Sequence, residues 1–260
     1  MEKLFTFILF LFGIGQLIQN NYISTLPIEI YNEFTNVFYI TSILYYVFEK
    51  ILNITSSTFR TIEPKHKKMY VVKNYIKSFF LLGLCSQLGN FFNLMNGTLD
   101  LMFIKRCAVY YIMNDIIGLL LVKKLPLTTK IHHITTTLCG FAVMMKKENN
   151  IDVLTLIVLY AVFSSIAFCV NFYLGFRIYS NNTFIKRYLS NISFWTYLLS
   201  CIVNWILQVN LAYKVMFCVP IYHFVFYLMF LYSVGKDDII LMKWLYDDHN
   251  KFKNIMKLNK

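Results

Sequence analysis

The chain has 260 residues, of which 58% are hydrophobic and 15% are charged, and its mean hydropathy is +0.55. Ordinary soluble domains contain roughly 45–50% apolar residues, so this composition excludes a typical soluble fold and predicts a membrane protein. The formal net charge of +12 invites a nucleic-acid-binding interpretation. The basic residues gather between apolar runs rather than in one binding motif, and we therefore expect no nucleic-acid partner.

Apolar runs recur along almost the whole chain. A helix needs about 20 mostly apolar residues to cross a bilayer, and backbone groups in lipid must hydrogen-bond within their own helix. The runs predict an all-α integral membrane protein, a multi-pass helical bundle with about eight transmembrane helices. The predicted spans are 4–19, 36–52, 74–95, 102–122, 131–145, 151–174, 191–212 and 215–234. The first could be a cleaved signal sequence, but its apolar run continues to Ile18, which favours a retained helix.

Lysine and arginine residues lie mainly in alternate connections between the predicted spans. By the positive-inside rule, both termini and the richer connections are then cytosolic, where basic residues face the anionic leaflet. The predicted organisation has three parts. They are N-terminal transmembrane helices with a basic cytosolic loop (1–69), a six-helix domain (70–234) and a mixed-charge cytosolic tail (235–260).

Polar side chains inside the predicted spans are the candidate functional residues, because burying them in a bilayer costs free energy unless they find partners. Asp115 is the only acidic residue well inside a span, and a carboxylate near the bilayer centre costs about 2.5–3.5 kcal/mol. At 1.5 Å rise per residue, Asp115 lies about 12 Å from the cytosolic end of its span. The same reckoning places further polar residues in the cytosolic half of the membrane, namely Gln87, Asn171, His223 and the pair His132-His133. This shared depth predicts one polar cavity open toward the cytosol.

Two adjacent histidines, His132 and His133, begin the fifth span, and each titrates near neutrality. Adjacent helical residues point about 100° apart, so one histidine can face a cavity while the other contacts a neighbouring helix. Thr135 and Thr136 follow within one turn and could orient an imidazole. Two plainer interpretations stay open: the pair lies among lipid headgroups, and His223 is a packing contact. The six cysteines are scattered without a Cys-x-x-Cys pair, so no metal site is predicted.

Tyr111 and Asp115 lie one helical turn apart, and sixteen residues separate Asp115 from His132-His133, which Thr135 follows. This arrangement resembles the TLC domain family, which includes ceramide synthases, translocation-associated membrane proteins and smaller lipid-homeostasis proteins. In ceramide synthases the paired histidines are implicated in moving a fatty acyl group from acyl-CoA to a sphingoid amine. The resemblance would give this role to His132 and His133.

The resemblance covers about 70–234 and implies a core of six transmembrane helices in an endoplasmic-reticulum-type membrane. Ceramide synthases carry further acidic residues and a histidine after the His pair, whereas residues 159–171 of this chain contain neither. The chain is therefore more similar to the small TLC-domain proteins than to true ceramide synthases.

Three functional hypotheses follow. The first is lipid binding or handling, in membrane lipid homeostasis, through a polar cavity near the cytosolic leaflet. The alternative is an acyl-CoA-dependent N-acyltransferase with His132, His133 and Asp115 as catalytic residues, and the third is a transporter or channel. The expected substrate-binding residues are Tyr111, Thr135, Thr136, Asn171, His223 and Gln87. No cofactor is expected, with acyl-CoA as a co-substrate if the protein is an enzyme; the expected partners are membrane lipids, and a homo-oligomer is left open.

Overall fold

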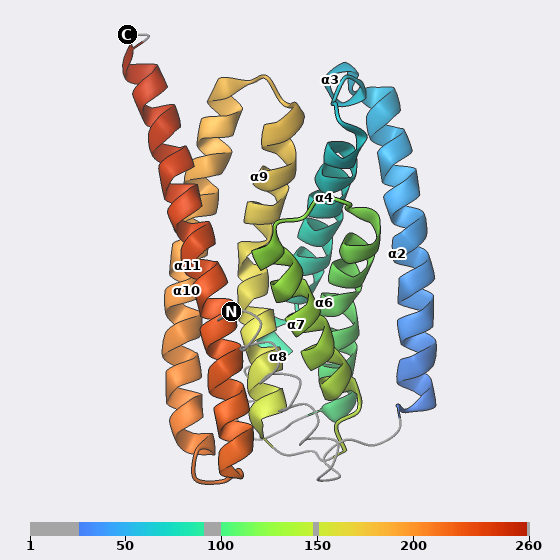
Figure 1. Ribbon diagram of the computed structural model, residues 1–260, viewed down its shortest axis with the longest axis vertical. Coiled ribbons are helices and arrows are strands. Elements are labelled where there is room, and N and C mark those ends of the chain that lie inside the picture. The colour runs from blue at the N-terminus through green and yellow to red at the C-terminus, as the bar shows by residue number, and fades with distance from the viewer. Residues whose placement is uncertain (1–25, 91–99, 148–150, 259–260) are drawn as a thin grey trace.

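The computed structural model describes residues 26–90, 100–147 and 151–258, and every regular element within them is a helix (Figure 1). The elements are α2 (Ile28–Thr55), α3 (Ser57–Arg60), α4 (Lys65–Cys85), α6 (Leu101–Leu121), α7 (Leu127–Met144), α8 (Val153–Ser164), the short 3-10 helix η1 (Ser165–Ala167), α9 (Phe168–Tyr179), α10 (Thr183–Val215) and α11 (Ile221–Leu258). The predicted all-α fold is thus confirmed for the described residues.

Three helical stretches are long and apolar enough to span a membrane, which indicates a membrane protein. They are Ile28–Thr55, Val153–Tyr179 and Thr183–Val215. The larger number of about eight spans stays a prediction, and the predicted span 4–19 lies outside the described residues.

The predicted span 74–95 is longer than the helix found there. The helix α4 ends at Cys85, where the Gln87 backbone N–H bonds to the Leu84 carbonyl and the Ser86 hydroxyl donates to the Gly83 carbonyl. These short-range bonds satisfy the last carbonyls and close the helix. Hydropathy alone gave no signal for this end.

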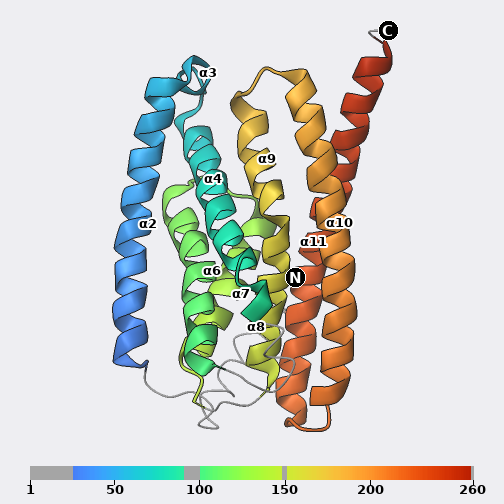
Figure 2. The same ribbon diagram turned by 180° about the vertical axis from the view of Figure 1, so that it is seen from behind.

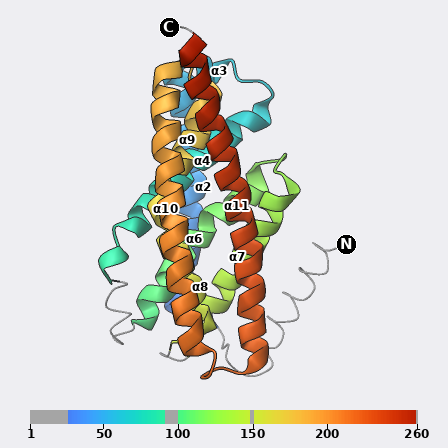
Figure 3. The same cartoon turned by 90° about the vertical axis from the view of Figure 1, so that its left-hand side faces the viewer.

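The long helices run side by side along the long axis of the molecule. In Figures 1 and 2, α2 lies at one edge and α10 with α11 at the other, with the remaining long helices between them. Figure 3 looks onto α10 and α11 and shows them packed along one another. The α6–α7 connection lies nearer the middle of the long axis than the neighbouring ends of α2, α9 and α10 (Figure 1). The hairpin of α6 and α7 therefore does not reach that end of the bundle.

Helix starts follow local sequence signals. The side chain of Asp100 accepts from two backbone N–H groups at the start of α6, and Asp152 and Asn182 cap α8 and α10 in the same way. Such side-chain oxygens satisfy N–H groups that have no partner within the helix. The helix α7 begins directly after Pro126, whose ring cannot continue a preceding helix.

The rod formed by α8 and α9 is interrupted by the single 3-10 turn of η1. The Ser165 hydroxyl donates to the Val162 carbonyl within this turn, and such back-bonding competes with the helical ladder. From α10, Ser200 donates to the Phe163 carbonyl and Asn204 to the Tyr160 carbonyl. Side chains of α10 therefore hold the interrupted segment against the bundle.

Close contacts hold the helices around the centre in register. A Cβ atom on Gly140 of α7 would lie 2.3 Å from Ile112 Cγ2 of α6, so only glycine allows this approach. The Tyr45 hydroxyl of α2 donates to Asn114 Oδ1 of α6 over 2.5 Å, in a buried setting. This hydrogen bond links α2 to α6 in the core.

The domain boundary predicted at residue 235 does not mark a break, because α11 continues from Ile221 to Leu258. The side chains of Asp238 and Leu245 are buried. They belong to the helix bundle, since the face of α11 that carries them packs inward.

Candidate functional site

A cavity of about 520 Å³ lies inside the bundle, with walls from α4, α6, α7, α9, α10 and α11. It is lined by Tyr70 near the start of α4, Thr128 near the start of α7 and Arg177 near the end of α9. These positions place it toward the end of the bundle that carries the α2–α4, α6–α7 and α9–α10 connections. The α6–α7 connection lies closer to the middle of the bundle than the other two connections (Figure 1).

Asp115 is the centre of a buried charged cluster behind the cavity wall. Its side chain is 0% exposed; Lys77 Nζ lies 2.6 Å from Oδ1 and His133 Nδ1 lies 3.0 Å from the same oxygen. The Thr136 hydroxyl donates to Oδ2 over 3.0 Å. A buried carboxylate is tolerated only with such partners. Of the sequence-predicted residues, Asp115, His133 and Thr136 are thus brought together.

Lys73 lies one turn before Lys77 on α4, is buried, and lines the cavity. Its Nζ forms a hydrogen bond of 2.8 Å with His133 Nε2. An amine that donates here makes Nε2 the acceptor, which leaves the ring proton on Nδ1, the nitrogen that faces Asp115. The imidazole of His133 is therefore held from both sides in one tautomer.

The other histidine of the pair, His132, faces α11. It lines the cavity, and its Nδ1 lies 3.4 Å from Asp237 Oδ2. The neighbouring Asp238 accepts hydrogen bonds from the hydroxyls of Tyr160 and Tyr197. The two histidines thus face different carboxylates, as their helical spacing predicts.

Arg177 and Asn171 of α9 form the opposite part of the wall. The guanidinium of Arg177 lies over the Trp244 ring of α11 at 4.1 Å, a cation–π contact that fixes its plane. Its Nε has no hydrogen-bond partner among the described residues. The site therefore offers a positioned donor whose hydrogen-bonding capacity is unused.

The cavity and the residues directly behind it hold equal numbers of opposite formal charges. The cationic residues are Lys73, Lys77 and Arg177, and the acidic residues are Asp115, Asp237 and Asp238. Sequence reasoning found only Asp115 of these six. The spacing of Lys73 and Lys77 by four residues on one helix was the available signal, but both were counted with the basic cytosolic loop.

Four predicted substrate-binding residues do not line the cavity, whereas Tyr111 and Asn171 do. One of the four, Thr136, bonds to Asp115 behind the wall. Thr135 is buried but is not part of the cavity wall. Gln87 lies beyond the end of α4 and bonds to nearby Ser86 and Asn90. His223 is at the start of α11, and its distance from Asp237 along the helix axis is about 21 Å at 1.5 Å per residue.

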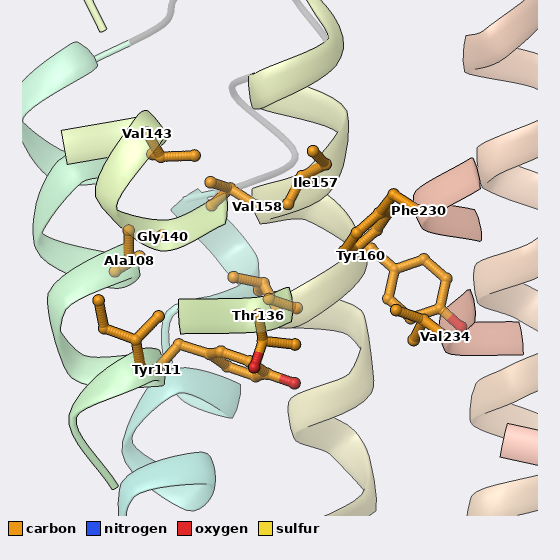
Figure 4. A pocket seen from close by; sticks show the side chains of 14 residues that line it. Ala108, Tyr111, Thr136, Gly140, Val143, Ile157, Val158, Tyr160, Phe230 and Val234 are labelled. Carbon is orange, nitrogen blue, oxygen red and sulfur yellow. The ribbon is translucent and has the colours of Figure 1, made fainter. Parts of the chain in front are cut away.

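An apolar pocket of about 30 Å³ shares the walls Tyr111 and Val234 with the larger cavity. Figure 4 shows Tyr111 and Thr136 at one end of this pocket and Val143 with Ile157 toward the other. The polar cavity thus has an apolar space directly beside it, which suits a ligand that is polar at one end.

A metal ion is the less suitable occupant. Ligand atoms of Asp115, His132 and His133 lie within 4.8 Å of one another, which is a possible donor set for a divalent cation. However, Lys77 Nζ is already 2.6 Å from Asp115, and Lys73 Nζ is hydrogen-bonded to His133. The ammonium of Lys77 repels a further cation, and the Lys73 amine already occupies the Nε2 of His133.

Comparisons of the chain with protein-family models, with curated proteins and with solved structures find no match.

Proposed function

We propose that this protein binds a membrane lipid by its headgroup in the charged cavity and takes part in lipid handling. The observation that carries the proposal is a cavity of about 520 Å³ with charged walls inside a membrane-type bundle. Its volume is in the range of small-molecule sites, roughly 300–1,000 Å³. Charged groups buried in a membrane protein usually mark a functional site.

The chemistry of the wall fits a polar headgroup with an attached chain. Arg177 presents a planar guanidinium with an unused donor, a group suited to phosphate or carboxylate oxygens. Asp237, whose side chain is 28% exposed, can accept a hydrogen bond from an amine or hydroxyl. Leu174 and Leu241 also line the cavity and offer apolar contacts to a chain.

The resemblance to TLC domains supports the same function, because it rests on Tyr111, Asp115 and His132-His133, and these residues line or support the cavity. On this basis we extend the proposal to a multi-pass protein with about eight spans. It would reside in an endoplasmic-reticulum-type membrane with both termini cytosolic, and would contribute to lipid homeostasis there.

Lipid retention tests the proposal. The protein is purified in a mild detergent, and the lipids that remain bound are identified by mass spectrometry against the bulk membrane extract. One lipid class should be enriched, and Arg177→Gln should reduce its retention by about tenfold or more, because a hydrogen bond to a charged group is worth about 1.5–3 kcal/mol.

Arg106→Gln is the matched control. Arg106 pairs with Glu33, does not line the cavity, and its loss should leave retention unchanged. Retained lipids identical to the bulk extract in every variant would refute the proposal.

The second candidate is an acyl-CoA-dependent N-acyltransferase, favoured by the orientation of His133 between Asp115 and Lys73. A positioned base can contribute about 10²–10⁴-fold to the transfer. Membranes containing the protein would be incubated with a panel of acyl-CoAs and long-chain bases. Transfer that is lost in the double variant His132→Ala, His133→Ala, with lipid retention preserved, would support catalysis, and no transfer with any pair would exclude it.

A further inference from the structure

Lys73 differs from the other buried lysine of the site in what surrounds its amine. Lys77 has a carboxylate partner at 2.6 Å. Among the described residues, no carboxylate oxygen lies within 4.0 Å of Lys73 Nζ, and the hydrogen bond of that nitrogen is to the His133 ring. Asp115 and Asp237 act on this amine only from beyond contact distance. A buried ammonium with no carboxylate in contact is costly, so this environment favours the neutral amine.

The adjacent cation strengthens this effect. Lys77 lies one turn along the same helix face, and like charges at this spacing repel. A lysine that is desolvated or placed next to another cationic group is the standard form of an activated amine nucleophile. Lys73 has both features and lines the cavity.

Gly118 of α6 makes the position possible. A Cβ atom there would lie 3.0 Å from Lys73 Cε and 3.3 Å from Cδ. Because Gly118 has no side chain, the aliphatic stem of Lys73 can pack directly against α6. In this position its amine reaches His133.

We propose that Lys73 is a nucleophile that forms a Schiff base with a long-chain aliphatic aldehyde held in the cavity. The inference rests on the proposed role of the cavity in binding lipids. An aldehyde is the electrophile that a neutral amine captures reversibly without a further reactant. Apolar wall residues such as Leu81, Leu174 and Leu241 would contact its chain.

The reaction balances within the site. The nitrogen lone pair forms the C–N bond, the carbonyl π electrons move to oxygen, and a proton passes from nitrogen to that oxygen. A second proton then passes from the nitrogen to the hydroxyl oxygen, the C–O bond breaks, water leaves with that electron pair, and the nitrogen lone pair forms the C=N bond. His133 Nε2, next to the amine, is placed to take the proton from nitrogen, and its Nδ1–H stays directed toward Asp115.

Reductive trapping tests the proposal. The full-length protein in detergent is incubated with hexadecanal and sodium cyanoborohydride, which converts an imine into a stable secondary amine, and the modified peptides are mapped by mass spectrometry. The adduct should concentrate on Lys73 and form at least about tenfold faster there than on any other lysine. Unfolding the protein first should abolish this preference.

Three variants extend the test. Lys73→Met keeps a stem of similar length without the amine and should remove the main adduct, whereas Lys67→Met, at an exposed position of the same helix, should leave it. Gly118→Ala should slow labelling of Lys73 by displacing its stem. The position of the adduct in the wild-type protein tests the proposal by itself, so the test does not depend on the folding of any variant.

Adducts spread evenly over the lysines would overturn the proposal. The lipids retained by the same preparation, analysed without aldehyde, report the proposed function separately. A preparation that retains a specific lipid but shows no preferred Lys73 adduct refutes the Schiff base alone, and a preparation with no specific lipid refutes the lipid-binding role.

Discussion

The buried pair of Lys77 and Asp115 should be strongly coupled in the stability of the protein. The two side chains are 10% and 0% exposed and their charged atoms lie 2.6 Å apart. Removing one partner of a buried pair leaves an uncompensated charge and costs about 3–5 kcal/mol. We expect Asp115→Asn and Lys77→Met each to lower the free energy of unfolding by that amount.

The double variant distinguishes pairing from a general loss of packing. Replacing both charges removes the uncompensated ion, so the double variant should be more stable than the sum of the single effects predicts by at least about 2 kcal/mol. Unfolding can be followed in mixed micelles with increasing dodecyl sulfate by the fluorescence of the three tryptophans.

A surface pair provides the control cycle. Arg106 and Glu33 lie 3.0 Å apart with side chains 54% and 21% exposed, and such pairs contribute about 0–1 kcal/mol. The variants Arg106→Gln and Glu33→Gln should therefore show little coupling. Additive effects of Asp115→Asn and Lys77→Met would refute the reasoning, as would single effects no larger than those of the surface pair.

Two further predictions concern packing and polar contacts in the core. Gly140→Ala should destabilise the protein by about 1–3 kcal/mol through overpacking, since its Cβ would lie 2.3 Å from Ile112; Gly83→Ala, with no atom within 4 Å, should be neutral or slightly stabilising in the same unfolding assay. Tyr45→Phe should cost about 1–3 kcal/mol because it leaves the buried Asn114 carbonyl oxygen without its donor, and an unchanged unfolding midpoint would contradict this.

Depth along a helix was only partly predictable from the sequence. Apolar runs and the rise per residue placed Asp115 and Asn171 at similar depths, and both belong to the site. The same reckoning included Gln87, which lies beyond the end of α4, and His223, which lies about 21 Å along α11 from Asp237. Hydropathy does not report where α4 ends or how far α11 continues, so these two depths could not be predicted from it.

The charged residues that sequence reasoning missed were those near the ends of predicted spans. Lys73 was counted with a solvated basic loop and Asp238 with a solvated tail, because charged residues near an apolar run usually lie in water. Their burial results from helices α4 and α11, which continue beyond the apolar runs. Helix length, which depends on packing against neighbours, was the missing information.

The balance of charges at the cavity has a consequence for how a ligand arrives. With Lys73 neutral, two cations and three carboxylates within one small volume leave a single unbalanced charge, which salt screens beyond a Debye length of about 8 Å at physiological ionic strength. The site therefore exerts little long-range attraction on a charged molecule, although the whole chain carries a formal net charge of +12. The site can distinguish one ligand from another only after the ligand has entered the cavity. There the ligand contacts individual charged groups, and salt ions have little access to screen them. A ligand delivered by lateral diffusion within the bilayer needs no electrostatic steering, so such a cavity is better matched to membrane-borne molecules than to ions drawn from water.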